Sequence, residues 1–169
     1  MLRSQDVLVA LRLSLGSDEP PPTFQDLSVE LGISSSQVHS AVRRTVLCRL
    51  VDEHSRRALG PNLCEFLVHG VKYVFPPLFT TVVPGVPTAI AAAPLREHFS
   101  IGSEPLPVWP HPHGSVRGQG LEPIHPAAPE AALKNPALHE LLALVDAVRA
   151  GRARERAMAI KELEARLHS

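Results

Sequence analysis

The chain has few aromatic residues and few cysteines. Aromatic side chains make up 4% of its 169 residues, which disfavours a platform that stacks the unpaired bases of single-stranded nucleic acid. Cys48 and Cys64 are the only cysteines, and they are too few for a disulfide scaffold and form no CxxC pair. We expect both to be buried, reduced thiols.

An excess of charge is also absent, because 17 basic residues balance 17 acidic ones. Any DNA-binding surface must therefore be local. Charged residues interrupt the apolar pattern of the N-terminus, and five prolines interrupt the most apolar stretch, residues 63–95. The sequence thus predicts neither a signal peptide nor a membrane-spanning helix, and we expect a cytoplasmic protein without a membrane partner.

Prolines divide the chain into three segments. Of the 17 prolines, 13 fall between Pro76 and Pro136, where helices cannot run uninterrupted. We expect a helical domain over residues 1–75, a proline-rich segment over 76–134 and C-terminal helices over 135–169. An apolar content of 44% is sufficient for a buried core.

Three helices are predicted in close succession in the first segment. The first occupies the N-terminal residues and ends at Gly16, and the second begins after Thr23 and stops at Gly32. Ser34 and Gln37 have the spacing of a capping box, so a third helix begins directly after the second. The inward face of this third helix is predicted to be Val38, Ala41, Val42 and Thr45.

Less regular structure is predicted beyond the third helix. Leu50-Val51 resembles a short strand, and a fourth, mostly buried helix is expected over about 61–74. Short strands are expected over residues 79–83 and 88–92, joined by a turn at Pro84-Gly85 and followed by an extended loop. Trp109 is expected to anchor that loop onto the helices by burying its ring.

The C-terminal segment predicts helices on both sides of Gly151. Asn135-Pro136 opens the first of them, with apolar residues at helical spacing along one face. A helical hairpin and one long kinked helix both agree with this pattern.

Three predicted elements follow one another between Thr23 and Asp52. They are a short helix that ends in Gly-Ile, a capped helix and a short strand. This order resembles the MarR-like winged helix-turn-helix transcriptional regulators. The resemblance covers the first third of the chain and rests on Leu27, Leu31, Gly32, Ile33, Ser34, Val38, Ala41, Val42, Leu50 and Val51. It implies a mainly α fold with a small β wing, in which a winged helix-turn-helix precedes the proline-rich segment and a C-terminal helical hairpin.

The sequence departs from the family pattern in two respects. Arg49 stands where a glycine usually ends the recognition helix, and Val46-Leu47 stand where charged residues are usual. Val46 and Leu47 project away from the helix's own core, so exposing them would cost on the order of 1 to 2 kcal/mol each. A contact within the chain and a dimer interface both account for the pair, and we expect a homodimer because paired recognition helices match half-sites one helical turn apart.

The resemblance implies that the 34–48 helix lies in the major groove of double-stranded DNA. Arg56 and Arg57 occupy the wing position, where they reach a phosphate or an adjacent minor groove. Between residues 34 and 60, five arginines stand against two acidic residues, and this local excess favours DNA binding over a merely solvated surface. The remaining candidate contacts, to base edges or to the backbone, are Ser35, Ser36, Gln37, His39, Ser40, Arg43 and Arg44.

Other signals are weak. Gly114, Gly118 and Gly120 fit turns and match no phosphate-binding loop, and the basic run over residues 151–156 fits a solvated helix face. No nucleophile motif or carboxylate pair stands out, so we expect neither an enzyme nor a cofactor. We expect no metal site either, because no carboxylate or cysteine stands at ligand spacing to the histidines of the middle segment, which are His98, His111, His113 and His125.

The sequence therefore predicts a sequence-specific regulator of transcription, a repressor, that binds double-stranded DNA. The rival prediction is a protein-interaction module, such as an antitoxin or adaptor, that grips a partner protein with its middle segment and C-terminal helices. Salt-dependent binding to duplex DNA separates the two.

Overall fold

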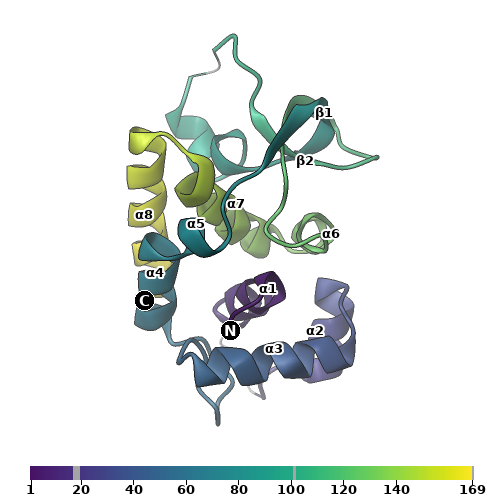
Figure 1. The fold of residues 1–169 in the computed structure, drawn as a ribbon, viewed down its shortest axis with the longest axis vertical. Coiled ribbons are helices and arrows are strands. Elements are labelled where there is room, and N and C mark those ends of the chain that lie inside the picture. Colours follow the sequence, from purple (N-terminus) through teal and green to yellow (C-terminus); the bar gives the residue numbers. More distant parts are fainter. Residues whose placement is uncertain (17–19, 101, 169) are drawn as a thin grey trace.

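The computed structural model describes residues 1–16, 20–100 and 102–168. In this part of the chain, eight α-helices and a three-stranded sheet form an α-rich fold (Figure 1), as the sequence predicted. In chain order the elements are α1 (Ser4–Leu13), α2 (Phe24–Leu31), α3 (Ser35–Leu47), α4 (Gly60–His69), α5 (Val71–Val74), β1 (Phe79–Pro87), β2 (Pro107–Pro110), β3 (Val116–Leu121), α6 (Ala128–Lys134), α7 (Pro136–Ala150) and α8 (Ala153–Leu167), with 3-10 turns at Ala89–Ala91 and Leu95–His98.

Helices α2 and α3 begin and end where the sequence predicted. The Thr23 hydroxyl accepts the Asp26 N–H, and the Asp26 carboxylate accepts the Thr23 N–H, both at 3.0 Å. Ser34 and Gln37 form the same reciprocal pair at the start of α3. Gly32 ends α2 with a φ of 67°, a left-handed conformation that glycine adopts without steric cost.

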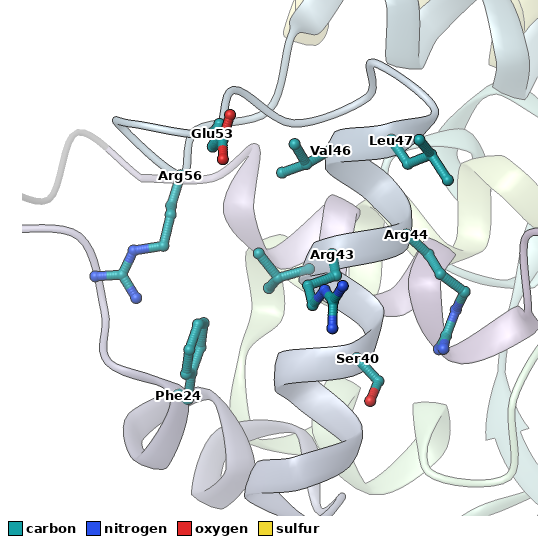
Figure 2. A pocket seen from close by; sticks show the side chains of 9 residues that line it. Phe24, Ser40, Arg43, Arg44, Val46, Leu47, Glu53 and Arg56 are labelled. Carbon is teal, nitrogen blue, oxygen red and sulfur yellow. The ribbon is translucent and has the colours of Figure 1, made fainter.

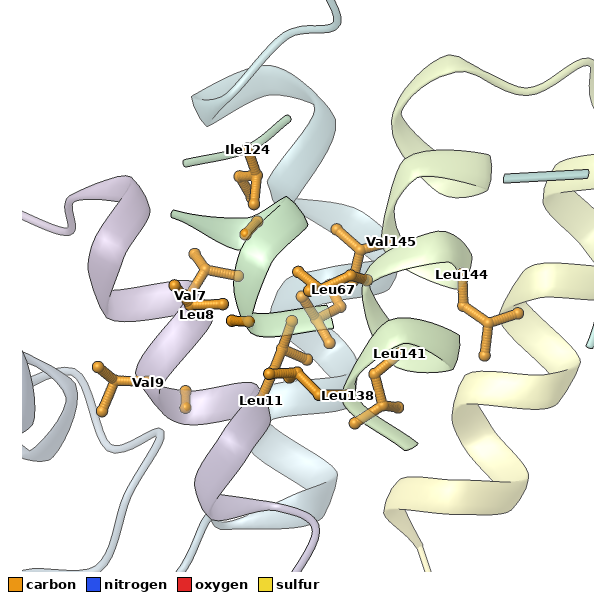
Figure 3. Packing of buried hydrophobic residues seen from close by; sticks show 14 of the residues in the cluster. Val7, Leu8, Val9, Leu11, Leu67, Ile124, Leu138, Leu141, Leu144 and Val145 are labelled. Atoms are coloured by element: carbon orange, nitrogen blue, oxygen red, sulfur yellow. The ribbon is translucent and has the colours of Figure 1, made fainter. Parts of the chain in front are cut away.

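Helix α1 is buried on all sides, whereas its apolar spacing predicted a single buried face. Every residue from Gln5 to Leu11 is buried. In Figure 1, α1 lies between the α2–α3 layer on one side and α6 and α7 on the other. Figure 3 shows Leu11 pointing toward Leu138 of α7, while Val9 points the opposite way. A helix with two packed faces must be apolar nearly all round.

The strand prediction for the proline-rich segment was wrong in most respects. Pro84 and Gly85 lie inside β1 and form no turn, and Thr88 to Ala92 contain a 3-10 turn in place of a strand. Strands β2 and β3 fall where an extended loop was expected. Each strand pairs with the other two, and β1 is antiparallel to both. Pairing partners far apart in sequence leave no local signal in either strand.

Two glycines allow these three strands to close on one another. The sequence predicted turns at Gly118 and Gly120, but both residues lie in β3. A Cβ atom on Gly118 would overlap the carbonyl oxygen of Leu106, and one on Gly120 would overlap the hydroxyl of Thr80. Both positions therefore require a residue without a side chain.

A buried polar network attaches the sheet to α7. Asp146 accepts hydrogen bonds from the Trp109 indole N–H at 2.6 Å and from the Thr88 hydroxyl at 2.7 Å. Its other carboxylate oxygen lies 2.6 Å from Arg149, which also donates to the Phe75 carbonyl at 2.8 Å. Burial raises the pKa of Asp146, an effect that the nearby Arg149 charge and the three donors oppose. Trp109 is 1% exposed, so the predicted anchoring role is confirmed, although its ring comes from a strand and not a loop.

The C-terminal segment is a helical hairpin, which settles the alternative left open by the sequence. Asn135 caps α7 by accepting the Leu138 N–H, and Gly151 separates α7 from α8. The apolar side of α7 packs against α1, α4, α5, α6 and α8, so its buried face is covered within the chain. The expected fourth helix is divided at Gly70 into α4 and α5.

Residues from all three segments enter one hydrophobic cluster, part of which Figure 3 shows. Of the two cysteines, Cys64 is buried there, and this desolvation raises the pKa of its thiol. Cys48 is exposed, contrary to expectation, because it follows the last turn of α3 where no other element covers it. Among the described helices, none combines the length and the apolar character that a membrane span requires.

Candidate nucleic-acid interface

Helix α3 lies at one end of the molecule, and the sheet lies at the other (Figure 1). Its predicted inward residues, Val38, Ala41, Val42 and Thr45, are all buried, against α1 and α2. No other described helix lies beyond α3 in Figure 1. The opposite face of α3 is therefore open to a ligand.

Most of the predicted contact residues of α3 are accessible. Ser36, Gln37, His39 and Arg43 are exposed, and Ser35 and Ser40 are half-buried. The Gln37 side-chain oxygen is engaged in the helix cap, 2.9 Å from the Ser34 N–H. Arg43 has no carboxylate partner among the described residues and projects from α3 beside Ser40 (Figure 2). Arg43 is thus the most available cation of this helix.

Arg44, the next residue, forms an ion pair within the chain. Its guanidinium donates two hydrogen bonds to the Asp6 carboxylate, at 2.7 and 2.8 Å. Asp6 is fully buried in α1, and the bonds to Asp6 raise the pKa of Arg44. Two of the Arg44 donors therefore hold α3 against α1, a role that the sequence did not predict.

Residues 51–58 form a small hairpin beside α3, here called the 51–58 hairpin. It has a single strand-like pairing, between Val51 and Ala58. The Asp52 N–H donates to the Arg57 carbonyl at 2.8 Å. The Asp52 carboxylate accepts from both the N–H and the hydroxyl of Ser55, which lowers the pKa of Asp52. A minimal hairpin with one bridge therefore stands at the position where the sequence predicted a wing.

The two hairpin arginines occupy different positions. Arg56 has a φ of 52°, and its guanidinium carbon lies 5.2 Å from the centre of the Phe24 ring. Arg57 lines a surface hollow with Pro20, Pro21 and Ser55. Arg56 therefore has the aromatic contact, although both arginines also line one small hollow with Arg12 and Pro22.

A groove of about 550 Å³ runs between α3 and the 51–58 hairpin (Figure 2), and we call it the α3 groove. Arg43 lies on its helix side, Arg56 and Glu53 on its hairpin side, and Phe24 at the start of α2. The sequence assigned no site role to Phe24 or Glu53. Nothing local could have indicated either residue, because the groove forms only when α2, α3 and the hairpin come together.

Val46 and Leu47 differ in their surroundings. Val46 is half-buried against the hydrophobic core, so a contact within the chain accounts for it. Leu47 is 79% exposed. Both side chains line the α3 groove, which gives this groove apolar as well as cationic surface.

Three of the remaining basic and histidine residues contact other groups of the chain. Arg156 donates to the Val148 and Gly151 carbonyls, which satisfies acceptors at the end of α7. Arg152 pairs with Glu104 on the surface at 2.8 Å. His111 lies 2.6 Å from Glu130. No group of three or more potential metal ligands occurs in the described ranges.

The α3 groove thus combines a capped helix with an accessible polar face, Arg43 and Arg44 on the helix side, Arg56 on the hairpin side and an apolar lining. Cations that line a cleft raise the local concentration of anionic ligands. No family model, curated protein or solved structure matches the chain.

Proposed function

We propose that the protein is a regulator of transcription that binds double-stranded DNA with α3 and the 51–58 hairpin. On this proposal, α2 and α3 form a helix-turn-helix and the hairpin acts as its wing. One observation carries the proposal. Arg43 and Arg56 line the same open groove at the end of the molecule, and neither has a carboxylate partner among the described residues.

The mechanism follows from the positions of the two arginines. Helix α3 enters the major groove, where its accessible side chains meet base edges. Arg43 reads guanine through a two-pronged hydrogen bond, worth about 1 to 3 kcal/mol of discrimination between bases. His39 and Ser36 add contacts on the same face. Arg44 keeps α3 in place through Asp6 and makes no contact with DNA.

The test is binding of the full chain to a random duplex and to a duplex selected by the protein, over a range of salt. We expect affinity to fall steeply as salt rises, because neutralised phosphates release counterions. Arg43→Ala should remove most of the preference for the selected duplex. Arg154→Ala removes an exposed charge from α8, outside the α3 groove, and serves as the matched control. Folded Arg43→Ala protein with full affinity and preference would refute the proposal.

The second candidate is a protein-interaction module, such as an antitoxin or adaptor. Exposed apolar side chains favour it, since Tyr73 of α5, Leu78 just before β1, and Phe79 and Val82 of β1 are exposed, at a distance from α3 (Figure 1). Exposed apolar clusters are common at protein interfaces. A protein of this kind alone should show little affinity for duplex DNA at any salt concentration, whereas a regulator that also binds a partner should show both activities.

A further inference from the structure

The 51–58 hairpin distributes its charges unevenly along its length. Glu53, His54 and Ser55 form the exposed tip, and Arg56 and Arg57 follow on the returning strand. The minor groove of DNA has a strongly negative potential, which attracts cations. A carboxylate at the tip opposes entry into that groove, so the cations of the hairpin must act nearer its base.

The backbone of Arg56 has a conformation that favours glycine. Its φ of 52° is in the left-handed region, where glycine is favoured and another residue is strained by about 1 kcal/mol or more. The Arg56 N–H donates to the Asp52 carbonyl at 3.0 Å, so a tight turn imposes this conformation. Glycine would fit this turn with less strain. What arginine adds at position 56 is therefore its guanidinium group.

That guanidinium is held by an aromatic ring. Phe24 lies under Arg56 at 5.2 Å, and its ring also meets the His39 ring edge-to-face, with 5.1 Å between centroids and 85° between planes. One side chain thereby joins α2, α3 and the hairpin. Figure 2 shows Arg56 extending from the hairpin toward Phe24, on the same side as the α3 groove. The cation is therefore directed away from the hairpin tip.

A helix in the major groove and a hairpin beside it must straddle one phosphodiester strand, because a strand separates adjacent grooves. The α3 groove lies between these two elements. We infer that Phe24 is a positioning residue, which holds Arg56 against this strand, so that the hairpin clamps a backbone phosphate and leaves the minor groove unread. This inference rests on the proposed function and adds the chemical group that the hairpin binds.

Arg56→Gly is the decisive variant, because it relieves the positive φ while removing the guanidinium. We expect unchanged or increased stability, weaker binding to all duplexes, and a salt slope lower by roughly one unit. Arg49→Gly is the matched control. Arg49 also has a positive φ, 57°, and is exposed, but it does not line the α3 groove. Its loss should lower the salt slope less than the loss of Arg56 does.

The role of Phe24 is tested in a double-mutant cycle. Phe24→Leu should weaken duplex binding in the wild-type background and have little effect in the Arg56→Gly background. Without DNA, Phe24→Leu should speed hydrogen exchange at the Arg56 amide and leave the Arg49 amide unchanged. Additive effects on binding, or unchanged exchange at Arg56, would overturn the positioning role.

The phosphate assignment is tested with modified duplexes of a sequence that the wild-type protein selects. Inosine in place of guanine beside the α3 footprint removes an amino group from the minor groove and should not change affinity. Ethylation of the phosphate at the hairpin should weaken the wild-type protein and not Arg56→Gly. Loss of binding with inosine would show minor-groove reading and overturn the clamp. Wild-type protein that binds no duplex would overturn the proposed function together with the clamp, whereas amide exchange would still report whether Phe24 holds Arg56.

Discussion

The first 75 residues and the proline-rich segment contain different kinds of structural information. In the first region, α2 and α3 are delimited by residues three positions apart, such as Thr23 with Asp26. In the second region, Val86 pairs with Trp109, and Val83 pairs with Gly118. Short-range caps can be identified in a sequence, whereas long-range pairing is decided by the collapsed chain. We therefore expect substitutions at long-range contacts to lower the free energy of unfolding more than substitutions at local caps.

The largest effect is expected at the longest-range contacts. Asp146→Ala removes the shared acceptor of Trp109 and Thr88 and leaves Arg149 buried without its ion pair. We expect the free energy of unfolding to fall by about 3 to 5 kcal/mol, measured by urea denaturation. The control is Glu104→Ala, which breaks an exposed ion pair with Arg152 and should cost about 1 kcal/mol or less. Similar losses in the two variants would show that the network does not anchor the sheet.

A smaller loss is expected at Arg44, a long-range contact inside the first region. Arg44→Ala leaves the buried Asp6 carboxylate without its ion-pair partner, and we expect a loss of about 2 to 4 kcal/mol. The neighbouring Arg43→Ala should change stability by about 0.5 kcal/mol or less, because Arg43 is exposed. Thermal and urea unfolding of the two variants measure this contrast. Equal stability would contradict the separate tasks assigned to adjacent arginines.

Gly118→Ala tests how tightly the sheet closes. The new Cβ atom would overlap the Leu106 carbonyl oxygen, and such overpacking typically costs about 1 to 3 kcal/mol. Gly102→Ala provides the comparison, since the nearest other atom to its Cβ lies 4.0 Å away. Denaturation midpoints of the two variants report the difference. A Gly118→Ala protein as stable as wild type would mean that β3 has room to shift.

The smallest effect is expected at a local cap. Ser34→Ala removes the acceptor of the Gln37 N–H at the start of α3, and such losses are typically about 1 kcal/mol. Ser36→Ala removes a hydroxyl that lies 3.1 Å from the Ser34 hydroxyl but keeps the acceptor of the Gln37 N–H, and it should have less effect. Calorimetry of both variants suffices to measure it. A Ser34→Ala loss that equals the Asp146→Ala loss would remove the distinction between local and long-range contributions.

For the candidate site, as for the fold, the sequence predicted features within one helix and missed contacts between distant residues. The sequence placed Arg43, His39 and Ser36 on the outward face of a capped helix, because helical periodicity assigns faces within one element. It could not separate Arg44 from Arg43, because the partner of Arg44 is Asp6, which lies 38 positions away. It assigned no site role to Phe24, because the contacts of Phe24 with Arg56 and His39 require three elements to meet.

The sequence by itself determined where helices α2, α3 and α7 begin and which face of α3 turns inward, because caps, prolines and helical periodicity act within a few residues. Only the tertiary structure decided that α1 is buried on two sides, that three strands close around Gly118 and Gly120, and that Arg56 lies on Phe24. These features depend on which distant surfaces pack together. That choice is made by the burial of the whole core, to which no single segment contributes enough apolar surface alone.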